Sequence, residues 1–335
     1  MIVLAVAVLA IGARIPIPGL DLAAASMQFA QGGLERLSIF ALGALPLFTV
    51  LALAEIVRLL LPRLANREGR TGRLLVGSLV LLLSALQGYG VLVALMAMGL
   101  MDETAASLVV GIAGFVGASA LLIWLADAIR LPGFDSGIWL LLTIPMLAAL
   151  PRELASSAEV IRSGVLPAGS LLIPVGAVVI AVGMVVAVNR LLAATGRHRE
   201  SRGDRDGGIP LAVLLWPPFL ANIVTGYVIA LPVIAVPDLA SAPWFFAAIS
   251  AVSDSVLIPL FVYGYLRLYP APRREELRPV LTIVAAVQVL ICVGLDLLNA
   301  VTVLPLLPSG GMLIACVTVL LVLGRLATGA VPDAA

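Results

Sequence analysis

The sequence predicts an all-α polytopic membrane protein with ten transmembrane helices. Of its 335 residues, 62% are hydrophobic and only 12% are charged. Charged residues make up about 25% of an ordinary soluble domain. Apolar runs of about 20 residues, the length that a helix needs to cross a bilayer, recur along the whole chain. No soluble core requires so many apolar residues, so we expect the chain to lie in a membrane.

Ten apolar stretches are the expected spans. The fifth is short and contains Pro145, and the outer segment after it, residues 152–169, could hold a short surface helix. The remaining loops are too short for a separate soluble domain, so we expect a single membrane domain over residues 1–335. The spans are residues 2–20, 38–61, 74–100, 105–129, 137–151, 170–192, 210–236, 243–266, 279–300 and 309–329.

The arginine residues predict the orientation of these spans. All 20 basic residues are Arg, and alternation of ten spans puts sixteen of them on one face and four on the other. Cytoplasmic loops carry the excess of positive charge, so both termini should be cytoplasmic. Two basic loops, near residues 58–73 and 190–208, could bind a ribosome or anionic lipid, although the orientation rule alone explains most of their charge. Their basic positions include Arg63, Arg67, Arg70, Arg197, Arg199 and Arg202.

No enzyme, metal site or cofactor is predicted. Cys292 and Cys316 lie in apolar runs, which is typical of small core residues rather than ligands. The single histidine, His198, lies in a charged segment. No phosphate-binding loop and no pair of nucleophile and base is evident, so we expect no enzymatic activity.

The stretch from Gly32 to Glu55, GGLERLSIFALGALPLFTVLALAE, is interrupted by a glycine and a proline. Gly43 and Pro46 should break or kink a helix. Bilayers tolerate a broken helix only where the loosened backbone packs against protein or lines a cavity. We therefore expect a helix in two parts, with the break turned toward a wet or mobile region. A plain kink packed in a bundle is the alternative.

Two motifs of the chain resemble the SecY protein-conducting channel family. They are IGARIPIPGLD, from Ile11 to Asp21, and GGLERLSIFALGALP, from Gly32 to Pro46. In that family the first motif closes the first span, and the second is the plug followed by the start of the second span. The resemblance implies a SecY-like fold of two inverted five-helix halves, residues 1–168 and 169–335. It also implies a passive channel that translocates or inserts polypeptides, with a lateral gate between spans two–three and seven–eight.

The resemblance implies particular pore residues. The constriction would be a ring of apolar side chains that seals by dewetting. The ring positions are Phe48, Ala52, Leu141 and Cys316. The plug, about residues 27–38, would swing on a glycine hinge. The plug and hinge positions are Gly32, Gly33, Leu34 and Ser38. The alternative is that these are ordinary buried residues and an interfacial loop.

Partners and location follow from the resemblance alone. They are SecE-like and SecG-like subunits, a SecA-like motor or a ribosome, polypeptide clients and the lipid of a bacterial inner membrane. Nucleic acid would be met only through the ribosome. In family members the loops after spans six and eight bind the ribosome and the motor. Here they shrink to about residues 190–208 and 267–278, so the docking surface is reduced.

Two acidic residues inside the spans leave other functions open. Asp254 and Asp296 could couple ions in a secondary transporter, because charges within a membrane are candidates for function. The simpler interpretation is a helix-to-helix hydrogen bond, with Asp254 beside Ser253 and Ser255. A third alternative is a degenerate relative of SecY that no longer conducts and acts as an insertion or structural factor.

Overall fold

The computed structural model describes residues 1–28, 37–61, 70–134, 136–163, 172–200, 211–236, 243–301 and 308–328. These residues are helical apart from turns and two isolated β-bridges. The helices are α1 (Ile2–Gly12), α2 (Leu22–Gln28), α3 (Leu45–Leu60), α5 (Arg70–Ala97), α6 (Ala105–Ala128), α7 (Ile138–Arg162), α8 (Leu172–Glu200), α9 (Ala212–Ala235), α10 (Pro243–Arg267), α11 (Ala271–Val301) and α12 (Gly310–Ala327).

Eight of the described helices, α5 to α12, are long and apolar enough to cross a membrane. They correspond to eight of the ten predicted spans, and the all-helical prediction is confirmed. The first two predicted spans contain shorter helices, α1 with 11 residues and α3 with 16. The reason is local, since α1 ends before the two prolines of IPIPG and α3 begins only after Gly43, which has a φ of +53°.

The chain divides into two compact units. The first comprises residues 1–131 and 136–145, and the second comprises residues 132–135 and 146–335. Helix α7 begins in the first unit and continues in the second. The predicted inverted halves, residues 1–168 and 169–335, stay a prediction.

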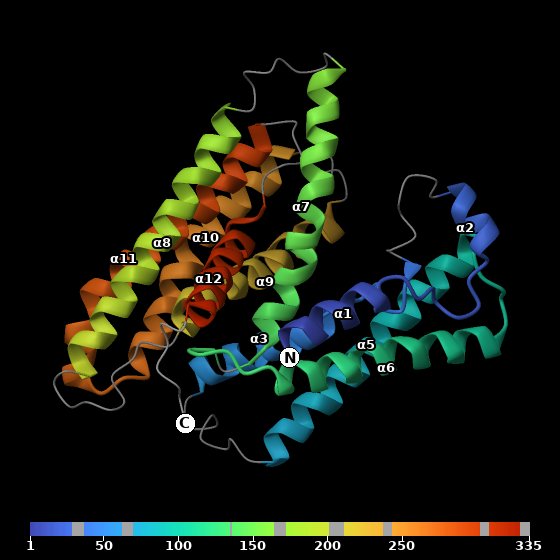
Figure 1. Cartoon of the computed structure of the whole chain (residues 1–335), viewed down its shortest axis with the longest axis horizontal. Helices are drawn as coiled ribbons and strands as arrows, with labels where there is room; N and C mark the ends of the chain where they lie inside the picture. Colours follow the sequence, from blue (N-terminus) through green and yellow to red (C-terminus); the bar gives the residue numbers. More distant parts are fainter. Residues whose placement is uncertain are drawn as a thin grey trace. The chain divides into compact units, whose positions relative to one another are not determined.

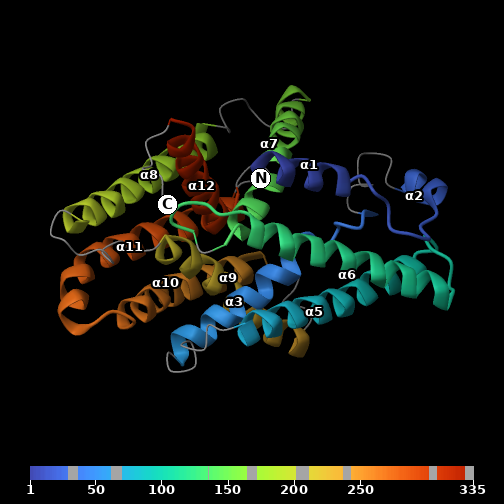
Figure 2. The ribbon, with the colours of Figure 1, turned by 60° about the horizontal axis from the view of Figure 1, so that its bottom comes forward.

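In the first unit, α5 and α6 lie side by side and α3 packs against α5 (Figures 1 and 2). Small residues bring α5 and α6 close together. A Cβ atom added to Gly88 would lie 2.8 Å from the ring of Phe115, and one added to Gly111 would lie 2.7 Å from the Leu92 side chain. Each glycine therefore accepts a large apolar side chain of the other helix.

A buried hydrogen bond also joins α5 to α6. The Ser84 and Ser119 hydroxyls lie 2.7 Å apart, and Ser84 lies 3.2 Å from the Phe115 carbonyl oxygen, which accepts its proton. We expect a double-mutant cycle of Ser84→Ala and Ser119→Ala to give a coupling energy of about 0.6 kcal/mol, the average for such bonds in membranes, and at most about 1.7 kcal/mol. Unfolding in detergent micelles measures it. Ser78→Ala, whose hydroxyl bonds only to Leu74 of its own helix, is the control. Strict additivity of the two changes would contradict the expectation.

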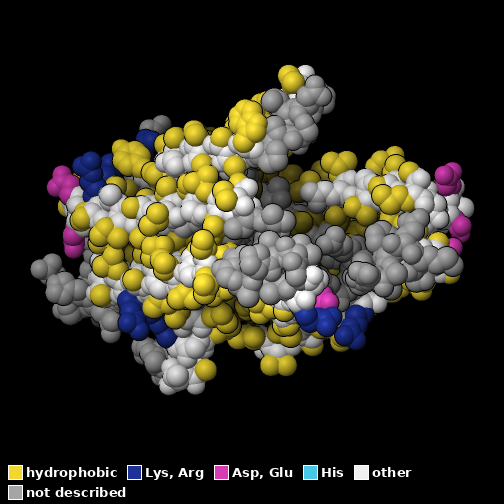
Figure 3. All heavy atoms as spheres, turned by 90° about the horizontal axis from the view of Figure 1, so that it is seen from above, with side chains coloured by type: hydrophobic (Ala, Val, Ile, Leu, Met, Phe, Trp, Pro, Cys, Tyr) yellow, Lys and Arg dark blue, Asp and Glu magenta, His cyan; other side chains and the backbone are white. Residues whose placement is uncertain are grey.

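In the second unit, α10 lies between α9 and α11, and α12 packs against α8, α9 and α11. Helices α10 and α11 are adjacent in both ribbon views (Figures 1 and 2). Large apolar side chains such as Val252, Val256 and Leu260 of α10 are exposed. Hydrophobic side chains spread over the outer surface of the helices in the space-filling view (Figure 3). Lipid is the surrounding medium that such a surface suits.

Three predicted non-membrane segments are largely helical in the structure. Helix α8 continues to Glu200, and α11 begins at Ala271, so residues 190–200 and 271–278 of the predicted loops at 190–208 and 267–278 are helical. Helix α7 continues to Arg162, which merges the predicted short fifth span with the surface helix after it. Charge marks where a helix leaves the bilayer rather than where it ends, because Arg and Glu are good helix formers.

The exposed end of α7 is stabilised by an ion pair. Arg162 donates from Nη2 to Glu159 Oε1 at 2.6 Å and from Nε to Oε2 at 2.9 Å. This hydrogen bonding holds the pKa of Glu159 below its ordinary value. Surface pairs of this kind add little stability, so the pair mainly orders the last turn of the helix.

Candidate functional site

The two motifs that resemble the channel family are hydrogen-bonded to each other. The Ile17 amide donates to the Leu37 carbonyl at 3.0 Å, and the Ile39 amide donates to the Ile15 carbonyl at 3.0 Å. Pro16 and Ser38 form an antiparallel bridge between these bonds. The prolines of IPIPG exclude a helix and lack amide donors, so the segment is extended and bonds only through alternate residues.

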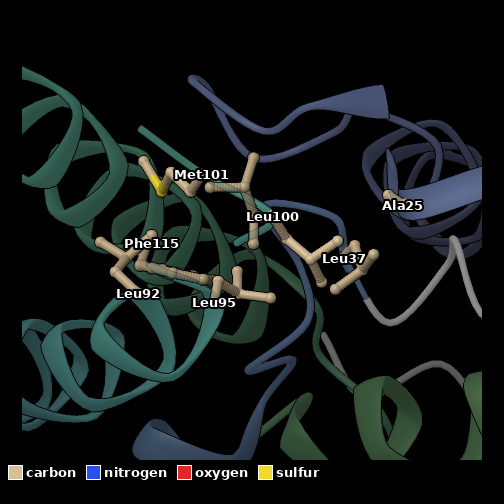
Figure 4. Close-up of a cluster of buried hydrophobic side chains, with 8 residues drawn as sticks. Ala25, Leu37, Leu92, Leu95, Leu100, Met101 and Phe115 are labelled. Carbon is tan, nitrogen blue, oxygen red and sulfur yellow. The ribbon is translucent and has the colours of Figure 1, made fainter. Parts of the chain in front are cut away.

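A buried apolar cluster anchors both ends of the predicted plug. Ala25 lies before the plug and Leu37 lies at its end, and both belong to this cluster with Leu100 and Phe115 (Figure 4). Asp21 caps the start of α2, because its Oδ1 accepts from the amides of residues 23 and 24 at 2.9 and 3.1 Å. The chain therefore enters and leaves the plug segment from fixed points in one core.

The interruption at Gly43 and Pro46 begins a helix rather than dividing one. Residues 37–44 form turns and a bridge, and α3 starts at Leu45 with Pro46 in its first turn. Proline is favoured there because its missing amide would be unbonded anyway and its fixed φ suits a helix. The prediction of a helix in two parts is wrong for this reason. The preceding segment is held instead by packing, because the Phe40 ring lies so close to Gly12 that a Cβ atom there would overlap the ring.

The four predicted ring residues are all buried. Phe48 and Ala52 are exposed by 7% and 0% on α3, Leu141 by 0% on α7, and Cys316 by 6% on α12. The Phe48 ring meets Trp139 edge-to-face, with 6.2 Å between centroids. Cys316 Sγ lies 3.3 Å from Met146 Sδ. These residues belong to both units, and their assembly into one ring stays a prediction.

Most of the predicted plug lies outside the described residues, including Gly32, Gly33 and Leu34. Ser38, the last predicted plug position, is described. Its side chain is 1% exposed, and its Oγ is buried without a hydrogen-bond partner among the described residues. Ser38 thus belongs to the anchored bridge, and the hinge role of the glycines stays a prediction.

The basic positions are only partly described. Arg63, Arg67 and Arg202 lie outside the described residues. Arg70 begins α5, and Arg197 and Arg199 lie in the last turns of α8, so none of these three is in a loop. At the α10–α11 turn, Arg274 Nη2 donates to the carbonyl oxygens of Arg267 and Tyr269, each at 3.2 Å. Arg274 therefore caps the end of α10 in the usual way for a cation at a helix C-terminus.

A residue that sequence reasoning missed repairs a defect in α9. Pro217 and Pro218 lack the amides that would bond to the carbonyls of residues 213 and 214. Gln288 of α11 donates from Nε2 to both carbonyls, at 3.1 Å to Val213 and 2.8 Å to Leu214. Its side chain is fully buried. An isolated glutamine in an apolar span, combined with adjacent prolines in another, was the available signal.

The two intramembrane acids come together. Asp254 of α10 and Asp296 of α11 line one cavity, at the start of α12. Among the described residues, Asp254 forms no hydrogen bond, while Ser255 donates to Ala251 of its own helix. The simpler interpretation, a helix-to-helix hydrogen bond from Asp254, is therefore not found there.

A family model described as SecY matches residues 38–276, more than half of the chain. The chain belongs to the SecY family. The match begins at Ser38, so it includes the second motif from SIFALG onward and lies beyond IPIPG. Family membership agrees with the prediction that this multi-pass membrane protein is not an enzyme, since its matched relatives are protein translocase subunits.

Curated SecY subunits match with modest identity. The chain is 31% identical to protein translocase subunit SecY of Pseudomonas aeruginosa over 182 residues, 48% of this chain and 41% of that protein. The values are 31% over 185 residues for Rickettsia conorii, covering 46% and 42%. For Buchnera aphidicola subsp. Baizongia pistaciae they are 26% over 190 residues, covering 49% and 43%. The chain thus spans about two fifths of the length of these relatives.

The SecY-like fold extends further than the sequence match. A solved structure, described as showing how the plug domain of the SecY protein stabilises the closed state of the translocation channel, has a TM-score of 0.59 with this chain. The likeness covers 98% of this chain and 91% of that one at 16% identity. At this identity the likeness supports a shared fold.

Proposed function

We propose that this SecY-family chain is a passive channel through which unfolded polypeptides cross or enter a bacterial inner membrane. The observation that carries the proposal is the hydrogen-bonded pairing of IPIPG with residues 37–39. This pairing fixes the end of the first predicted span to the segment that opens the second. The predicted plug lies along the chain between IPIPG and residue 39. Any displacement of the plug from a pore would therefore take place between these two hydrogen-bonded segments.

Ten spans in two inverted halves, with both termini cytoplasmic, complete the proposed channel. Phe48, Ala52, Leu141 and Cys316 would form the apolar constriction, and a signal segment would leave sideways between predicted spans two–three and seven–eight. The burial of all four side chains supports a dry constriction, since a ring of apolar residues seals by excluding water.

Partners would supply the energy and complete the assembly. SecE-like and SecG-like subunits and a SecA-like motor or ribosome are the candidates. The connection between α10 and α11 is only residues 268–270, and α8 and α9 are joined by residues 201–211. The Arg274 side chain already bonds to carbonyl oxygens at the end of α10. A motor would therefore have to bind helix ends here rather than a long basic loop.

Removing the plug should open the channel. We expect a variant with residues 29–36 replaced by a four-glycine linker to show wide, weakly selective conductance in planar bilayers, because the anchors at Ala25 and Leu37 remain while the seal is lost. The matched control replaces residues 203–208, between α8 and α9, with the same linker and should stay as closed as the natural chain. If the plug variant is folded and does not conduct, the channel proposal fails and the structural or insertion factor becomes the better hypothesis.

A secondary transporter remains the alternative because Asp254 and Asp296 line one cavity. If the protein is a transporter, replacing either aspartate with asparagine should abolish uptake of the transported solute. In a translocation channel the same changes should leave polypeptide transport nearly unaltered. Reconstituted vesicles that measure polypeptide translocation distinguish the two.

A further inference from the structure

A polar cavity lies among α9, α10, α11 and α12 of the second unit. Its volume is about 70 Å³, and about 10–15 Å³ is enough for one water molecule. Pro218 of α9 and the two glycines at the start of α12, Gly310 and Gly311, belong to its wall. Its polar lining consists of Asn222, Thr225, Ser250, Asp254, Asp296 and Ser309.

Two polar groups of this lining are buried without a protein partner. Thr225 is 3% exposed, and its Oγ1 is buried with no hydrogen-bond partner among the described residues. Asp254 is 7% exposed and has no hydrogen bond or ion pair within the described part of the chain. Buried hydroxyls and carboxylates are costly unless they are paired. A bound ligand would give the Thr225 hydroxyl and the Asp254 carboxylate the partner that the described residues do not provide.

The charges around the cavity are not balanced. Asp254 and Asp296 both line it, and its lining includes no Arg or His among the residues that the structure describes. The start of α12 lies there too, and a helix N-terminus carries about +0.5 of an elementary charge. That partial charge is much smaller than the two negative charges of ionised carboxylates. A bound cation would neutralise the remaining negative charge of the cavity.

A more open groove adjoins the cavity. It has a volume of about 420 Å³ and is lined by residues near the start of α10 and the end of α11, including Phe246 and Asn299. Ser250 and Asp296 line both the groove and the cavity. The groove lies at the opposite end of α10 and α11 from their arginine-rich turn, so an entering cation would not pass those arginines.

We propose that this cavity binds a monovalent metal cation of the size of Na⁺ through the Asp254 and Asp296 carboxylates and the Thr225 hydroxyl. Oxygen ligands suit hard cations. The described residues contain no group of three or more acidic, Cys or His side chains that would suggest a divalent ion or a transition metal. Asn222, Ser250 and water can fill the remaining positions. The ion would link α9 to α10 and α11, and this role does not depend on polypeptide transport.

Binding of radioactive sodium to the purified full chain in detergent tests the site. The natural chain should bind sodium saturably in choline chloride of constant ionic strength. Asp254→Asn and Asp296→Asn should each weaken binding by about tenfold or more, since a charged contact contributes about 1.5–3 kcal/mol and tenfold is about 1.4 kcal/mol. Thr225→Val should weaken it by about fivefold, and Thr225→Ser, which keeps the hydroxyl, should restore it.

Controls use the same chemical changes outside the cavity. Glu275→Gln removes an exposed carboxylate from α11, and Thr282→Val removes a hydroxyl that bonds to Arg278 of the same helix. Both should bind sodium like the natural chain. Thermal unfolding, followed by tryptophan fluorescence, should show stabilisation by sodium in these proteins, because a ligand that binds only the folded state raises its stability.

Several results would overturn the proposal. One is the absence of saturable sodium binding to the natural chain, and another is unchanged binding in the folded carboxylate variants. A third is thermal stability that responds to pH but not to sodium, which would assign shared protons to the two acids. If the carboxylate variants do not fold, sodium binding by Thr225→Val and Thr225→Ser tests the site instead. Equal binding by these two variants would overturn the proposal. No outcome bears on the channel proposal, since binding is measured without translocation.

Discussion

Replacing Gln288 with leucine should lower the free energy of unfolding by about 3 kcal/mol, because a buried carbonyl left without a donor costs about 1–3 kcal/mol. The Val213 and Leu214 carbonyls would both lose their donor. Pro217 and Pro218 cannot replace it, since neither has an amide hydrogen. Unfolding of the purified protein in detergent micelles, followed by circular dichroism, measures the change.

A background without Pro217 and Pro218 makes this prediction specific. In a chain that carries Pro217→Ala and Pro218→Ala, the new amides can bond to the two carbonyls, so Gln288→Leu should cost less than half as much. Gln87→Leu on α5 is the matched control: Gln87 is half-buried, and the change should alter stability by less than about 0.5 kcal/mol. An equal cost of Gln288→Leu in both backgrounds would show that the glutamine acts by packing alone.

Replacing Gly310 with alanine should destabilise the protein by about 2–3 kcal/mol through overpacking. The added Cβ would lie 2.5 Å from the Cys292 Cα and 2.8 Å from its backbone nitrogen. These are backbone atoms of α11, so no side-chain rotation can relieve the contact. The start of α12 would have to move away from α11.

The neighbouring glycine provides the control. A Cβ on Gly311 would meet its nearest atom, Pro218 Cβ, at 3.4 Å, an ordinary contact. Alanine is the better helix former, so Gly311→Ala should be neutral or stabilising by up to about 1 kcal/mol. Thermal unfolding of the two variants side by side measures the difference. Equal stability of both variants would mean that α12 is not closely packed on α11 at Gly310.

The sequence predicts the helices of this protein better than their ends. Eight of ten predicted spans contain helices long enough to cross a membrane, because a long apolar run is a local signal. The helix ends depend on backbone details that hydrophobicity does not report. Gly43 and the prolines of IPIPG shorten the first two helices, whereas charged helix formers extend α8 and α11 beyond their apolar runs.

The residues of the candidate sites could also be predicted from the sequence, whereas the contacts between them could not. The motifs at residues 11–21 and 32–46 were visible as patterns and point to the SecY family that the comparison shows. Their mutual hydrogen bonds were not visible, because sequence does not state which extended segments pair. Asp254 and Asp296 were visible as charges within spans, but the cavity that they share depends on helix packing.

By itself, the sequence determined the membrane environment, most of the helices and the family, since hydrophobicity and short motifs are read along the chain. Only the tertiary structure decided that Gln288 serves Val213 and Leu214, more than seventy residues away. It also decided that Thr225, Asp254 and Asp296 surround one cavity. Such arrangements depend on how helices pack, because a buried polar group must find its partner across space wherever its own helix cannot supply one.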